Sequence, residues 1–115
     1  MSEHRPTSHR EIVELPVGVE DSQTGRLLRE AEVRAVTAGD ELFIGTSPEY
    51  NRFPNDLVYK TLLLSRTVTK LGAKTAVTLD DIRRLHALDL RALEYAVYRI
   101  TYGDGVVPET SGPGG

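Results

Sequence analysis

Two segments of alternating hydrophobicity precede a run of helical hydrophobic periods, and this order constrains the fold more than any other feature. Between residues 12 and 36, apolar side chains occupy every second position at Val13, Leu15, Val17 and Val19. A second alternation follows, in which Leu27, Ala31, Val33 and Ala35 alternate with Glu30, Glu32 and Arg34. The polar turn at residues 20–25 separates the segments and contains Gly25, which can adopt a positive φ. The pattern predicts a β-hairpin with one buried face, which helices must cover because an isolated hairpin is marginal in water.

The rest of the chain carries hydrophobic stripes and capping residues typical of about four helices. Residues 46–54 contain two prolines and are predicted to be a loop, and residues 73–77 are predicted to be a connector. Strands followed by a run of helices indicate an α+β fold with the helices packed on one side of the hairpin. The first expected helix covers residues 37–45, with Thr37 and Asp40 in a capping box, and the second extends from an Asn55 cap to Leu71 and is closed by Gly72. The third begins at Thr78 with Asp81 at its third position, and the last is capped by Asp89 and ends at Gly103.

Length and composition favour one domain over residues 11–103. The chain has 115 residues, which is room for a single core. Residues 1–10 and 104–115 are polar or rich in glycine and proline, so both are expected to be flexible tails. The longest apolar run is far too short to cross a membrane, and the N-terminus lacks the apolar segment of a signal peptide. A cytoplasmic location is therefore expected.

The residue types needed for catalysis or for metal and cofactor binding do not gather in the sequence. There is no cysteine, which excludes thiolate chemistry and disulfides. His4, His9 and His86 lie far from further ligands, so no metal site is expected. The paired carboxylates Asp80 and Asp81 stand in the first turn of a predicted helix, where capping explains them. We expect no enzymatic activity, no catalytic residue and no cofactor.

Two surfaces on the C-terminal helices are candidates for contact with a macromolecule. Tyr95, Tyr98 and Tyr102 are spaced three and four apart beside Arg99, a composition common at protein interfaces. Alternatively, these tyrosines complete a small core, with their hydroxyls reaching solvent. A helix-turn-helix surface for DNA would require one basic face, formed by Arg83, Arg84, Arg91 and Arg99. The net charge of −3 disfavours nucleic-acid binding.

A series of short motifs occurs in an order that is more specific than any one of them. The series spans about residues 12–105 and resembles the small tail-assembly and baseplate-type proteins of contractile-tailed phages and related injection systems. The motifs are Glu14-Leu15-Pro16-Val17-Gly18, Arg29-Glu30-Ala31-Glu32-Val33-Arg34, Thr37-Ala38-Gly39-Asp40-Glu41, Leu62-Leu63-Leu64-Ser65-Arg66, Leu71-Gly72, Leu79 with Asp81, Leu88-Asp89-Leu90-Arg91-Ala92-Leu93 and Arg99-Ile100-Thr101-Tyr102-Gly103-Asp104.

The resemblance implies a non-enzymatic role in building the tail, with other tail or baseplate proteins as partners. Asp89 and Arg91 match the acidic-x-basic turn before the last helix, and Arg99 to Asp104 match its ending. Many baseplate-type members continue into a cysteine-rich segment that this chain lacks, which favours an assembly chaperone over a permanent component of the particle. The sequence also allows the chain to form a homo-oligomer. The candidate partner-binding residues are Asp89, Arg91, Tyr95, Tyr98, Arg99 and Tyr102.

Overall fold

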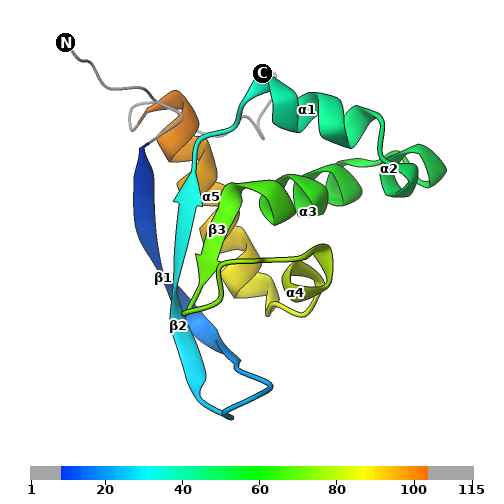
Figure 1. Cartoon of the computed structure of the whole chain (residues 1–115). Helices are drawn as coiled ribbons and strands as arrows, with labels where there is room; N and C mark the ends of the chain where they lie inside the picture. The colour runs from blue at the N-terminus through cyan, green and yellow to red at the C-terminus, as the bar shows by residue number, and fades with distance from the viewer. Residues whose placement is uncertain (1–8, 104–115) are drawn as a thin grey trace.

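The computed structural model describes residues 9–103 and has an α+β fold, as predicted. A three-stranded antiparallel sheet with the strand order β1-β2-β3 packs against helices (Figure 1). The tails expected at 1–10 and 104–115 lie outside the described residues, except for His9 and Arg10, and Arg10 already belongs to the first strand. The elements are β1 (Arg10–Glu20), β2 (Leu27–Arg34), α1 (Ala38–Gly45), α2 (Pro48–Arg52), α3 (Asp56–Thr67), β3 (Val68–Leu71), α4 (Leu79–Arg83) and α5 (Ala87–Tyr102).

The N-terminal hairpin is confirmed, with an irregularity that the alternation did not predict. β1 and β2 pair from Arg10 opposite Arg34 to Glu14 opposite Glu30, and the register then shifts before Val19. Val13 and Leu15 are buried, as expected from the alternating pattern. Val17 lies within the shifted segment, so its side chain leaves the buried face and is exposed, contrary to the prediction.

A third strand replaces the end of the long helix. α3 begins after an Asn55 cap, as predicted, but it ends at Thr67 rather than Leu71. Val68 and Leu71 are buried in β3, where they lie opposite Val33 and Ala31 of β2. Gly72 therefore follows a strand and does not cap a helix. The burial of Val68 and Leu71 suits both a helical stripe and a strand, and only the pairing with β2 decides between them.

The short helices form where capping side chains bind the free backbone amides of their first turns. Thr37 with Asp40 and Thr78 with Asp81 form the two predicted capping boxes, at the starts of α1 and α4. The loop predicted over residues 46–54 contains a one-turn helix, α2. It forms because the Ser47 side chain accepts a hydrogen bond from the Tyr50 amide and proline occupies the first turn, where a missing N–H costs nothing.

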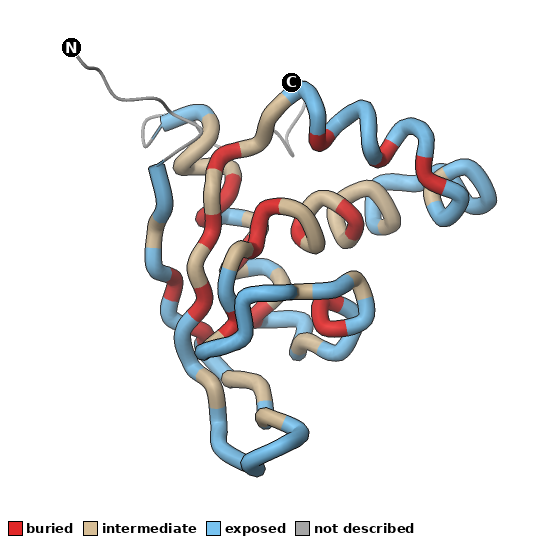
Figure 2. Tube along the Cα trace, in the orientation of Figure 1, coloured by how far each residue is buried: buried red, intermediate tan, exposed pale blue. Residues whose placement is uncertain are grey.

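The core lies where the sheet meets α5 and α3 (Figure 2). α5 contributes the buried residues Leu93, Ala96 and Val97 against the inner face of β1 and β2. α1, α2 and α3 extend from the sheet to one side (Figure 1). α5 is capped by His86 rather than by Asp89, so that prediction was wrong, and it ends at Gly103 as expected. No helix among residues 9–103 has the length and apolarity needed to span a bilayer.

Candidate functional site

A hollow of about 300 Å³ lies between α3 and α5, close to the start of α1. Its wall is mainly aromatic and apolar, and we call it the tyrosine groove after the residues that form this wall: Tyr59 and Leu63 of α3, and Tyr95, Tyr98 and Tyr102 of α5. Each of these α5 tyrosines lies away from the helix face that carries Leu93, Ala96 and Val97 into the core. The core residues Leu64 and Val97 also line the groove, so the groove lies directly against the core while its tyrosines remain outside it.

All three tyrosines of α5 line the groove, and two of them are in direct ring contact. Tyr98 and Tyr102 are one helical turn apart, and their ring centroids are 4.7 Å apart in a tilted arrangement. Tyr95 is 52% exposed and Tyr102 is 55% exposed, so both rings can lose contact with water when a partner binds. The guanidinium of Arg99 lies 5.4 Å from the centroid of the Tyr95 ring, within the range of a cation–π contact.

Tyr59 supplies the opposite wall of the groove. Its ring packs edge-on against Tyr50 of α2, with 6.0 Å between the ring centroids. Burial raises the pKa of Tyr59, and the nearby carboxylate of Glu41 raises it further. The phenol therefore stays neutral near pH 7, where its hydroxyl can donate a hydrogen bond. Tyr59 could not be predicted from the sequence as a groove residue, because its place there depends on the packing of α3 beside α5.

The rim of the groove carries charges of both signs. Arg91 and Glu94 of α5 form an ion pair with 3.1 Å between Nη1 and Oε2. Lys60 of α3 pairs with Asp56 at 3.2 Å, and Glu41 of α1 lies on the same rim. A rim with charges of both signs around an aromatic wall suits an uncharged or amphipathic partner surface better than a phosphate or another strongly anionic ligand.

The structure brings four of the six predicted site residues into this groove. Arg91, Tyr95, Tyr98 and Tyr102 all line it. Arg99 lies beside the groove and its guanidinium donates to Glu11 of β1, at 2.6 Å, so it also holds α5 to the sheet.

Asp89 does not belong to a contact surface. Its side chain is fully buried and accepts hydrogen bonds from the backbone amides of Val17 and Gly18, at 2.8 and 2.9 Å. These amides lie in the part of β1 where the register shifts. We therefore assign Asp89 to the fold and withdraw it from the partner-binding set.

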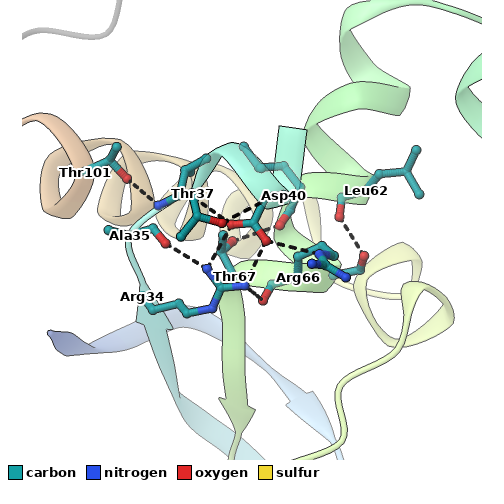
Figure 3. Close-up of polar contacts among 11 residues, drawn as sticks. Arg34, Ala35, Thr37, Asp40, Leu62, Arg66, Thr67 and Thr101 are labelled. Atoms are coloured by element: carbon teal, nitrogen blue, oxygen red, sulfur yellow. Dashed lines mark hydrogen bonds and ion pairs between the residues drawn. The ribbon is translucent and has the colours of Figure 1, made fainter. Parts of the chain in front are cut away.

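A second buried carboxylate, Asp40, fastens α1 to the sheet and to α3 (Figure 3). Both of its oxygens accept from Arg34, at 2.9 Å each, and one accepts from Nε of Arg66 at 3.1 Å. The amide of Thr37 donates to it at 2.8 Å. Burial alone would raise the pKa of Asp40, but the hydrogen bonds and positive charge of these partners hold it well below the ordinary value. An inaccessible carboxylate that stays ionised is an anchor and not an acid–base catalyst.

The remaining polar candidates have structural roles. Asp81 closes the capping box of α4 and pairs with Lys74 at 2.8 Å, and the net effect of these partners is to lower its pKa although burial opposes the shift. Nδ1 of His86 accepts from the Leu88 amide at the start of α5. Within residues 9–103, no three histidine, aspartate or glutamate side chains are grouped so that they could hold a metal ion.

Three of the four arginines of the helix-turn-helix alternative, Arg84, Arg91 and Arg99, are engaged with carboxylates. Arg84 pairs with Asp80 at 3.1 Å, and Arg91 and Arg99 pair with Glu94 and Glu11. The first helix of the pair, α4, is only five residues long. This arrangement gives α4 and α5 no uniformly basic face, so it disfavours phosphate binding by these helices.

Comparison of the chain with protein-family models, with curated proteins and with solved structures found no match. The geometry of the tyrosine groove is therefore the structural basis on which a function can be argued.

Proposed function

We propose that this chain is a non-enzymatic protein-binding factor that acts in the cytoplasm during assembly of a contractile phage-tail-like particle, in the manner of a tail assembly chaperone. The observation that carries the proposal is the tyrosine groove, where tyrosines from two helices form an accessible apolar wall under a mixed-charge rim. The motif series described above supplies the biological setting. The groove supplies the means of binding.

The chemistry of the groove suits reversible capture of an apolar segment of another protein. Tyrosine offers a large contact area with few rotatable bonds, so little conformational entropy is lost on binding. Its hydroxyl can pair with backbone groups of the bound segment while its ring covers apolar side chains. A groove of about 300 Å³ can accommodate a few side chains, which fits a contact that must be released when the tail subunits assemble.

Several of the motif residues support the fold that positions this groove. Asp89 binds the Pro16-Val17-Gly18 segment, which holds α5 against β1. Asp40 with Arg34 and Arg66 holds α1 and α3 together at the groove's other side. The motif series is thus compatible with a scaffold that presents the tyrosines of α5, and the partner specificity is expected to lie in the groove itself.

The test uses cells that produce the particles, in which the tagged full-length chain replaces the native one. We expect mass spectrometry to find it with unassembled tail proteins and to find none of it in purified, assembled particles. The double variant Tyr95→Ala/Tyr102→Ala is expected to lower capture of those tail proteins at least about tenfold, the scale of an interface hot spot. Phe53→Ala removes an aromatic ring that is 64% exposed outside the groove, and it should leave capture unchanged.

The other possible results would each contradict a stated part of this proposal. Presence in finished particles at fixed stoichiometry would favour the alternative of a minor baseplate component. Equal loss of capture in the Phe53→Ala control would move the contact surface away from the tyrosine groove. Failure to find the chain with tail proteins in either fraction would overturn the proposal, and retention on DNA at low salt would then favour a regulator.

A further inference from the structure

The outer edge of β1 has no strand beside it within residues 9–103. The sheet has the order β1-β2-β3, so among the described strands β1 pairs with β2 alone (Figure 1). The edge of such a strand presents backbone N–H and C=O groups that can pair with another chain. Its length and its side chains restrict which strand can fit.

The open edge ends at a definite point. Pro16 has no N–H to donate, and the amides of Val17 and Gly18 are already bound to the carboxylate of Asp89. The regular pairing of β1 with β2 also stops at Glu14. The segment available for a new strand therefore covers Arg10 to Glu14, close to the commonest strand length of about five to six residues.

The side chains on the exposed face of this segment have poor partners within the chain. Arg10, Ile12 and Glu14 alternate with the more buried Glu11 and Val13, and Ile12 is 61% exposed. In the register with β2, two of them face a like charge and the third faces a carboxylate: Arg10 lies opposite Arg34, Glu14 opposite Glu30, and Ile12 opposite Glu32. Like charges directly opposite each other destabilise a sheet, so the residues of β2 that lie directly opposite Arg10 and Glu14 do not compensate their charges.

We propose that the partner for this edge is β1 of a second copy of the chain. Antiparallel pairing centred on Ile12 places the two Ile12 side chains opposite each other and sets each Arg10 against Glu14 of the other copy. A two-fold axis through this point makes the contact self-complementary and closed. It adds two cross-strand ion pairs around an apolar contact on the side of β1 that faces away from β2, and it joins the two sheets into one of six strands.

The sign pattern is what selects a second copy. An edge whose charges were all of one sign would repel its own copy, which is a common protection against association. Here the opposite charges of Arg10 and Glu14 are symmetric about Ile12, so the antiparallel register converts them into attraction. The interface is small, so the dimer forms weakly and reversibly. It does not use the tyrosine groove, and it stands or fails independently of the proposed function.

The experiment is sedimentation equilibrium of the full-length chain over a wide range of concentration, at low and high salt. We expect reversible dimerisation that salt weakens. Arg10→Glu and Glu14→Arg should each weaken it about tenfold, because each change turns two attractive pairs into two repulsive ones. The double variant Arg10→Glu/Glu14→Arg restores opposite charges in the same register, and it should return dimerisation to within about twofold of the original.

Arg83→Glu is the matched control, because it reverses an exposed charge on α4, away from the edge, and should not change dimerisation. Thermal unfolding of every variant establishes that the fold is retained. A chain that stays monomeric throughout would overturn the proposal, and so would a double variant no better than the single ones. Assemblies that grow beyond a dimer would indicate head-to-tail pairing instead. A full-length chain that stays monomeric and dimerises only after deletion of residues 1–8 would identify the chain's own N-terminus as the occupant of the edge, and would also overturn the proposal.

Discussion

At the scale of single residues, Asp40 holds three elements together with one carboxylate. Its partners come from the end of β2, the N-terminus of α1 and the last turn of α3. Asp40→Asn keeps the shape but leaves Arg34 and Arg66 facing a neutral amide. Because both arginines are partly exposed, water offsets part of the loss, and we expect unfolding to become easier by about 2–3 kcal/mol. Chemical denaturation of the two proteins measures this difference.

Asp56→Asn is the matched control, because it removes a carboxylate that is 80% exposed and pairs with Lys60 on the surface of α3. Little change is expected there. The pH dependence gives a second test. Folding lowers the pKa of Asp40 below the ordinary 3.8, so its contribution is complete above that value and is lost as acid protonates the folded state. The gap between the wild type and Asp40→Asn should therefore narrow below pH 3.8, and a gap independent of pH would contradict this account.

At the scale of elements, the packing of β3 against β2 depends on the glycine at position 72. The φ of Gly72 is +62°, its amide donates to the carbonyl of Glu30 at 2.7 Å, and an added Cβ would lie 2.7 Å from a methyl carbon of Leu28. Gly72→Ala thus strains the backbone and the packing of β3 on β2, and we expect a loss of about 1–3 kcal/mol in thermal unfolding. Gly45→Ala at the end of α1 meets nothing within 4 Å and should be neutral or slightly stabilising. Similar results for the two would refute the role of Gly72.

The region before Gly72 also shows which helices and strands can be predicted from the sequence and which cannot. The hairpin and the two capping boxes follow from local patterns, and they are present in the structure. The end of α3 does not follow, because the spacing of Leu64, Val68 and Leu71 fits a helix as well as a helix followed by a strand. The choice is made by β2, which lies more than thirty residues earlier in the chain and binds β3. Long-range pairing of this kind leaves no local signal.

The same limit applies to the candidate site. The spacing of Tyr95, Tyr98 and Tyr102 placed them on one side of a helix, which the structure bears out. Tyr59 was missed because it reaches the groove only through the packing of α3. Asp89 was predicted to cap the last helix, since aspartate is a preferred capping residue. Its actual partners are backbone amides in β1, and no pattern within the helix points to them.

At the scale of the whole molecule, Asp89 connects the first strand to the last helix across 72 residues of sequence. The two amides that it binds lie in the segment of β1 where the register with β2 shifts. In Asp89→Asn, the amide oxygen can still accept from Val17 or Gly18, but the side-chain NH₂ then faces the other N–H. We expect a loss of about 2–3 kcal/mol, because a charged acceptor is removed and a buried donor is left unpaired.

Hydrogen exchange can separate this local contact from a general loss of stability. In Asp89→Asn, one of the Val17 and Gly18 amides loses its acceptor and the other keeps only a neutral one, whereas Val33 in the central strand keeps its strand partners. Exchange at the first two should therefore accelerate more than exchange at Val33. Asp80→Asn changes an exposed carboxylate of α4 and should leave all three rates close to the original. Uniform acceleration at every site would mean that Asp89 contributes only to global stability, whereas selective acceleration would show that it holds β1 against α5 and so fixes the helix that carries the tyrosines.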